Sequence, residues 1–118
     1  MTPREIYSLE VGELEKRVLG HWPELAQACA FAKERHEGQE RKRGGPYVAH
    51  PFRVALLLKE EGGLDDEGLA CAALLHDLVE DTHTSHEEIR KSQRWHQLWR
   101  LRVSVSGHLS VLSTFLLR

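Results

Sequence analysis

An apolar segment that runs directly into a group of titratable side chains constrains the fold of this sequence most. Residues Glu67 to Val79 are rich in alanine and leucine, which predicts a helix buried on most of its sides at the centre of the domain. A histidine and three carboxylates lie at or just beyond its end, namely His76, Asp77, Glu80 and Asp81. Because such groups are costly to bury without partners, the fold has to bring partners to them.

Helical periodicity also dominates the rest of the first 91 residues. Glycines end several apolar-periodic segments, and prolines occupy the first turns of two of them, where the missing N–H costs nothing. We expect helices at Ile6–Leu19, Pro23 to about Glu37 and Phe52 to about Glu61, and a fifth that starts at a capping box of Ser85 and Glu88. Strand patterns are nearly absent from this stretch, so the predicted architecture is all-α.

Length and charge limit the class of protein. A chain of 118 residues, with 41% hydrophobic and 29% charged residues, is typical of one globular domain. Its net charge of −2 argues against a general affinity for nucleic acid or anionic membranes. No apolar run approaches the roughly 18 residues of a spanning helix, and the N-terminal part lacks a signal-peptide pattern. We therefore expect a cytoplasmic protein in which Cys29 and Cys71 are reduced core thiols.

The spacing of the titratable group suggests a metal site. His76 and Glu80 are four residues apart, as are Asp77 and Asp81, so each pair shares a helix face if the helix extends that far. A histidine nitrogen with carboxylate oxygens suits a divalent ion such as Mn, Fe, Zn or Mg. The alternative is a solvated acidic loop after a helix in which His76 is a satisfied core histidine.

A second group of residues lies between the histidines His36 and His50. The intervening loop contains three glycines and the adjacent cations Arg41, Lys42 and Arg43. Cations beside a carboxylate–metal site are what a phosphate-bearing substrate needs, although such a charge run can also be merely solvated. Tyr47 is a candidate stacking surface for a substrate and an equally reasonable core residue.

At this point the motifs resemble a known family. The run HEGQERKRGGPYVAHP, from His36 to Pro51, is followed by AALLHDLVEDT, from Ala72 to Thr82. Together they are similar to the hydrolase domain of RelA/SpoT proteins and small alarmone hydrolases, over roughly residues 25–91. The resemblance implies an all-helical HD-domain bundle that hydrolyses the 3′-pyrophosphate of guanosine tetra- or pentaphosphate, usually with Mn²⁺.

The resemblance also implies a role for individual residues. His50, His76 and Asp77 would be metal ligands, and Glu80 and Asp81 would orient or deprotonate the attacking water. Arg41 and Lys42 would line the site of the guanine nucleotide, with Tyr47 beside them. Arg43 and Gly45 depart from the serine and glutamate common at their positions, which affects fine substrate contacts rather than the metal.

The composition changes abruptly at Ser92. All 18 acidic residues precede Lys91, and residues 92–118 are basic and rich in serine. The family's fourth metal ligand, an aspartate on a later helix, has no counterpart there. Either an amphipathic or β-type tail or a change of reading frame would account for this segment. We therefore divide the chain into a metal-dependent phosphohydrolase core at 1–91 and an atypical tail at 92–118.

An incomplete C-terminal half has two expected consequences. The predicted helices that begin at Phe52 and Glu67 have apolar faces that must pack against other parts of the protein. We therefore expect a homo-oligomer unless the tail covers these faces. Tail residues suited to this are Trp95, Trp99, Leu112, Phe115, Leu116 and Leu117. The chain is also compatible with an inactive HD scaffold that binds metal or nucleotide or oligomerises. A phosphatase for another nucleotide, such as a dinucleotide with a 2′-phosphate, is the alternative enzyme.

Overall fold

The structure is a computed structural model, and it describes residues 2–42, 44–63, 65–75, 78, 82, 84, 85, 87 and 88. Its helices are α1 (Pro3–Ser8), α2 (Val11–His21), the 3₁₀ helix η1 (Pro23–Leu25), α3 (Ala26–Arg35), α4 (Ala49–Glu60) and α5 (Glu67–Leu75). Among the described residues the sole β-type pairing is an isolated bridge between Glu40 and Pro46. The all-α prediction is confirmed for this part of the chain.

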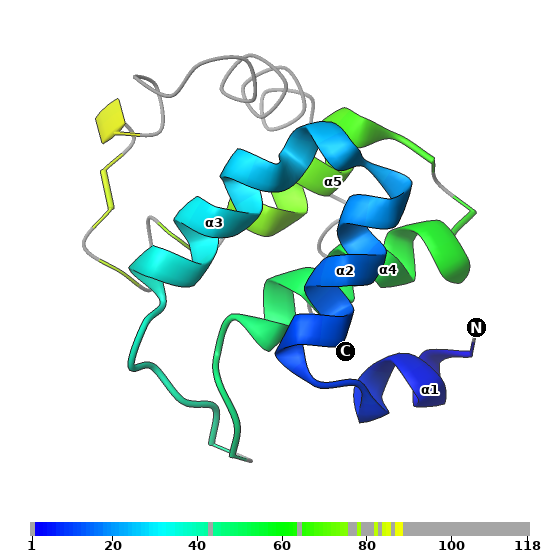
Figure 1. Cartoon of the computed structure of the whole chain (residues 1–118), viewed down its shortest axis with the longest axis horizontal. Coiled ribbons are helices and arrows are strands. Elements are labelled where there is room, and N and C mark those ends of the chain that lie inside the picture. Colours follow the sequence, from blue (N-terminus) through cyan, green and yellow to red (C-terminus); the bar gives the residue numbers. More distant parts are fainter. Residues whose placement is uncertain are drawn as a thin grey trace.

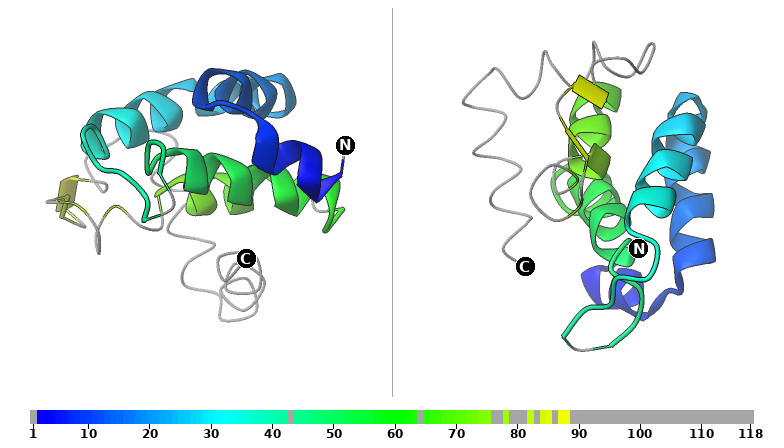
Figure 2. Two further views of the ribbon diagram at one scale, coloured as in Figure 1. Left: turned by 90° about the horizontal axis from the view of Figure 1, so that it is seen from below. Right: turned by 90° about the vertical axis from the view of Figure 1, so that its left-hand side faces the viewer.

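The helices form two layers (Figure 1). In one layer α2 and α3 follow each other through η1, and in the other α4 and α5 lie beneath them, as the left view of Figure 2 shows edge-on. Helix α4 packs against α5, α2 and α1, whereas α3 packs against α5. This arrangement places the loop between α3 and α4 at the end of the bundle.

Helix α5 lies in the core, as its composition predicts. Every residue from Gly68 to Leu75 is buried. Such an all-round apolar helix is stabilised by burial of about 1.5–3 kcal/mol for each large aliphatic side chain. Cys29 of α3 and Cys71 of α5 are both buried free thiols, in agreement with the prediction from the sequence.

The N-terminal part differs from the prediction of one helix at Ile6–Leu19. Two helices occupy this stretch, and extended backbone at Leu9 and Glu10 separates them. Thr2 starts the first helix early, because its side chain accepts a hydrogen bond from the Glu5 backbone N–H at 3.2 Å. The bend lets both Ile6 and Leu14 become fully buried, on two helices that each pack against α4. Apolar periodicity alone does not distinguish one bent segment from one straight helix.

Helix ends follow the local chemistry of the sequence. Asp66 caps α5 by accepting a hydrogen bond from the Leu69 N–H at 3.1 Å. The predicted capping box is present, since Ser85 N–H donates to the Glu88 carboxylate at 3.2 Å and Glu88 N–H donates to Ser85 Oγ at 3.1 Å. Gly63, at φ +64°, lies in the turn that follows α4.

Among the residues that the structure describes, no helix is both long enough and apolar enough to cross a membrane.

Candidate metal and phosphate site

The end of α3 and the start of α4 bring three aromatic rings together. The ring centroids of His36 and Tyr47 are 4.9 Å apart, and those of Tyr47 and His50 are 6.0 Å apart. His50 is the second residue of α4, because this helix starts at Ala49 rather than after Pro51 as the sequence suggested. Pro51 still lies in the first turn, where a missing N–H is tolerated. Two sequence-predicted residues, Tyr47 and His50, thus lie side by side.

Backbone hydrogen bonds shape the loop that carries the cations. Tyr47 N–H donates to the Gln39 carbonyl at 2.9 Å, and Arg41 N–H donates to the Gly45 carbonyl at 3.0 Å. The chain reverses through Gly44 and Gly45 at φ +92° and +85°, which side-chain-bearing residues rarely adopt. We call residues 38–48 the phosphate loop, and its described residues 38–42 and 44–48 form a closed turn with Arg41 and Lys42 near the tip.

The loop cations are available for an anion. Arg41 is half-buried and Lys42 is exposed. Neither forms an ion pair with another residue in the described part of the chain. The structure thus presents both cations without neutralising them, although it does not test their assignment to a nucleotide. Arg43 lies outside the described residues.

His36 is a site neighbour that the sequence interpretation left without a role. Its side chain is 2% exposed, and its Nδ1 lies 2.9 Å from Gln39 Oε1. Its Nε2 is buried and finds no hydrogen-bond partner among the described residues. A buried polar atom of this kind calls for a partner such as water or a ligand group. Its signals in the sequence were its place at the end of a helix, before a glycine-rich loop, and its position as first residue of the motif His36–Pro51.

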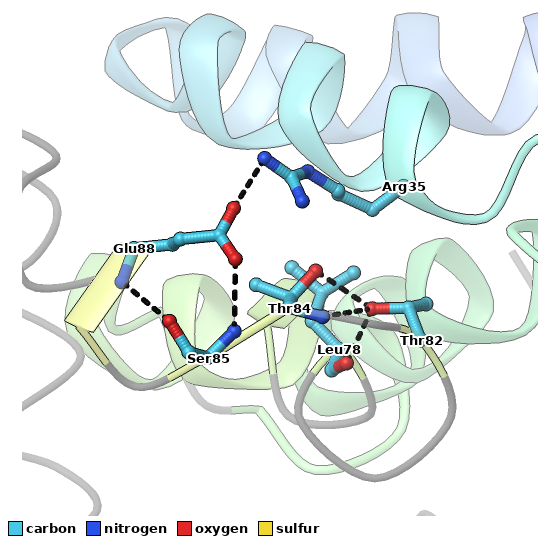
Figure 3. Close-up of polar contacts among 6 residues, drawn as sticks. All are labelled: Arg35, Leu78, Thr82, Thr84, Ser85 and Glu88. Atoms are coloured by element: carbon cyan, nitrogen blue, oxygen red, sulfur yellow. Dashed lines mark hydrogen bonds and ion pairs between the residues drawn. The ribbon is translucent and has the colours of Figure 1, made fainter.

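Polar contacts fix the segment that follows the core helix (Figure 3). Arg35, the last residue of α3, forms an ion pair with Glu88. Thr82 donates from both its N–H and its hydroxyl to the Leu78 carbonyl, and its hydroxyl also contacts that of Thr84 at 2.6 Å. The Arg35–Glu88 pair ties the segment beyond Asp81 to the end of α3, directly before His36, whereas the Thr82 contacts are local, to Leu78 and Thr84.

The remaining predicted site residues, His76, Asp77, Glu80 and Asp81, lie outside the described residues. Within the described part, no three histidine, cysteine or acidic side chains come together as a metal site. Of the three predicted ligands, only His50 lies in the described part of the chain, and its imidazole offers one nitrogen. With a second imidazole from His76 and a carboxylate from Asp77, the donor set would have the chemistry of a divalent-ion site. The residue types therefore fit a metal, and the ligand assignment stays a prediction.

Comparisons with known proteins support the resemblance read from the motifs. A family model described as "HD domain" matches residues 28–95, more than half of the chain. A guanosine-3′,5′-bis(diphosphate) 3′-pyrophosphohydrolase of Aquifex aeolicus is 51% identical over 83 residues, 67% of this chain and 12% of the relative.

Two further relatives have related names. The guanosine-3′,5′-bis(diphosphate) 3′-pyrophosphohydrolase MESH1 of Xenopus tropicalis is 49% identical over 55% of this chain and 37% of its own length. The bifunctional (p)ppGpp synthase/hydrolase SpoT of Escherichia coli is 46% identical over 57% of this chain and 9% of its own length. The chain thus spans at most about two fifths of the length of these relatives.

Proposed function

The chain belongs to the HD domain family, and from this premise we propose that it is a metal-dependent hydrolase of guanosine tetraphosphate that releases the 3′-pyrophosphate. The observation that carries the proposal is the identity of 46–51% with pyrophosphohydrolases of that name. The HD-domain match at residues 28–95 includes the phosphate loop and the His76–Asp81 stretch. The packing of Tyr47 between His36 and His50 is consistent with it, because it joins the loop to the first proposed ligand.

The proposed metal site consists of His50, His76 and Asp77. A divalent ion, for which we propose Mn²⁺, would supply Lewis acidity toward the phosphoryl oxygens and the attacking water. His50 is held for this role at the first turn of α4, a buried helix, so its ring direction is set by a rigid element. The ligand set would be completed by water, by tail residues or by a second chain.

The proposed reaction is hydrolysis at the phosphorus that carries the 3′-oxygen. Oxygen of water forms the new bond to phosphorus while the bond to the 3′-oxygen breaks, which yields guanosine 5′-diphosphate and pyrophosphate. Glu80 and Asp81 would orient the water and accept its proton. The 3′-oxygen leaves with a proton returned from the same carboxylates or from solvent.

The phosphate loop would bind the nucleotide. Arg41 and Lys42 are not neutralised by carboxylates in the described structure, so they can pair with phosphate oxygens. Tyr47 would support this site through its ring, which lies against both neighbouring imidazoles.

We also infer that the protein is cytoplasmic and that it self-associates. Size exclusion with light scattering tests the self-association, and a monomer across the micromolar range would contradict it.

The decisive experiment is hydrolysis of guanosine tetraphosphate by the purified chain with Mn²⁺. We expect guanosine 5′-diphosphate and pyrophosphate in equal amounts, and no product from a His76→Ala, Asp77→Ala variant. Binding of Mn²⁺ and nucleotide without turnover would instead favour the alternative of a binding scaffold. Faster release of phosphate from a dinucleotide with a 2′-phosphate would reassign the substrate.

A further inference from the structure

A cleft of about 430 Å³ lies beside α1, away from the three aromatic rings of the candidate site. Residues 7–11 line it from the α1–α2 junction, residues 44–46 from the phosphate loop, and Ala49 and Arg53 from α4. Of the described site residues, Tyr47 and His50 do not line it. Ala49 and Arg53 are four residues apart and share a face of α4, and Arg53 lies about 60° around the helix from His50, three residues before it.

Arg53 is the cation among the residues that line this cleft, and no carboxylate of the described residues forms an ion pair with its guanidinium. Its Nε is buried without a hydrogen-bond partner among the described residues, and its Cζ lies 5.5 Å from the centre of the Tyr7 ring. Burial lowers the pKa of Arg53, and the charge of Arg41 lowers it further. An anion bound at Arg53 would offset both effects, because it favours the charged guanidinium.

Glu10 also lines the cleft, but it does not neutralise Arg53. The Glu10 side chain is exposed, and no ion pair joins it to Arg53 in the described structure. A carboxylate in contact would raise the pKa of the guanidinium, whereas the pKa of Arg53 is lowered. Within the described part of the chain, the positive charge of Arg53 thus has no ion-pair partner.

The remaining walls suit a flat apolar group. Leu9, Val11 and Ala49 provide aliphatic surface, and Tyr7 provides an aromatic ring that is 43% exposed. Gly44 and Gly45 form the wall on the loop side, and no atom lies within 4 Å of where a Cβ would stand on either. A cleft of this volume is within the range of small-molecule sites, roughly 300–1,000 Å³.

We propose that this cleft binds a phosphomonoester with a ring-sized apolar body, held by Arg53 at the phosphate and by Tyr7 and the aliphatic wall around the ring. The site is separate from the proposed hydrolytic centre, and ligand binding there needs neither a metal nor His50. Because residues 44–46 belong to both the cleft wall and the phosphate loop, an occupant would also restrict the loop that carries Arg41 and Lys42.

The test is a titration of the full chain with phenyl phosphate in the presence of EDTA. Binding is measured in NMR spectra from the chemical shifts of the backbone amides and of Arg53 Nε–H. We expect saturable shifts at Val11, Gly44 and Gly45. Arg53→Gln should weaken binding at least about tenfold, because a charge-assisted contact to the phosphate is lost. Arg53→Lys keeps a cation in the cleft and should bind with intermediate affinity.

Three controls decide between this proposal and its rivals. Arg17→Gln removes an exposed arginine that pairs with Glu13 on α2, and it should bind phenyl phosphate like the parent chain. His50→Ala should also keep the affinity, and a loss would place the ligand at the hydrolytic centre instead. Equal affinity for benzoate would contradict the phosphate assignment. Unsaturable shifts, or equal affinity in Arg53→Gln, would overturn the proposal, while the hydrolysis assay remains an independent test of the proposed function.

Discussion

The Arg35 guanidinium lies 2.5 Å from the Glu88 carboxylate, which joins the last residue of α3 to the capping box beyond the His76–Asp81 stretch. The same carboxylate also accepts the hydrogen bond from Ser85 N–H (Figure 3). One side chain thus caps a helix start and fastens it to the bundle. Both partners are about one-third exposed, so the contact serves position more than overall stability.

Glu88→Gln should therefore loosen this segment more than it lowers global stability. The glutamine retains an oxygen for Ser85 N–H but loses the charge that faces Arg35. We expect faster amide hydrogen exchange at Ser85 and Glu88, with a nearly unchanged midpoint of urea unfolding. The matched control is Glu13→Gln, which removes an exposed pair with Arg17 on α2. Unchanged exchange at Ser85 would contradict the tethering role.

The same contact predicts a dependence on pH. The backbone hydrogen bond from Ser85, and then the Arg35 charge, hold the pKa of Glu88 below its ordinary value. A carboxylate with a lowered folded pKa stabilises the fold above its unfolded pKa, about 4.3, and this contribution disappears as the pH falls through the folded value. Exchange at Ser85 should thus rise below about pH 4.3 in the parent chain, relative to residues in α5, and not in Glu88→Gln.

Leu74→Ala should destabilise the fold by about 2–5 kcal/mol, because α5 has no solvent-facing side. Leu74 is fully buried in the core cluster. Urea unfolding followed by circular dichroism measures the change, and Lys16→Ala on the exposed face of α2 is the control. A loss below about 1 kcal/mol for Leu74→Ala would mean that α5 is not the centre of the core.

The two core thiols should resist alkylation in the native state. Burial raises the pKa of Cys29 to about 12, and burial also raises the pKa of Cys71. Little reactive thiolate exists at neutral pH, and reagents have no access. Mass spectrometry after iodoacetamide treatment should find both cysteines unmodified in buffer and modified in urea. Rapid modification of Cys71 in buffer would contradict its place in the core.

The fold is predictable from the sequence where an apolar segment or a helix-capping motif marks a helix locally. The apolar segment from Glu67 is central, and the Ser85–Glu88 capping box forms as expected, because both signals are local and have one structural solution. The break at Leu9 and Glu10 was not predictable, since its cause is packing of two short helices on α4. The start of α4 at Ala49 depends likewise on the closed turn before it.

The candidate site is only partly accessible to sequence reasoning. The motifs identify Tyr47 and His50, and the structure brings their rings together. Arg53 lies outside the two quoted motifs, and His36 begins one of them without an assigned role. The importance of both comes from burial and from nitrogens that lack a partner among the described residues, which depends on tertiary packing. The predicted roles of His76 and Asp77 remain predictions that mutagenesis has to test.

Arg41→Ala tests the nucleotide part of the proposed function. Its loss should raise KM for guanosine tetraphosphate about 10- to 100-fold with a smaller effect on kcat, because a charge-assisted contact to the bound substrate is removed. Arg17→Ala on α2 serves as the control for a lost surface arginine. An equal fall in kcat with unchanged KM would mean that Arg41 acts in the transition state rather than in substrate binding.

His36 offers a test of the missing hydrogen-bond partner itself. The ring is buried against Tyr47, whereas Nε2 has no partner among the described residues. His36→Phe keeps an aromatic ring but removes both ring nitrogens, and with them the contact of Nδ1 with Gln39, so stability should fall by no more than about 1 kcal/mol. His36→Ala leaves a cavity and should cost about 2–4 kcal/mol in urea unfolding. If His36→Phe is as destabilising as His36→Ala, then polar contacts of the ring, at Nδ1 with Gln39 and at Nε2 with a further partner, hold His36 in place rather than ring packing.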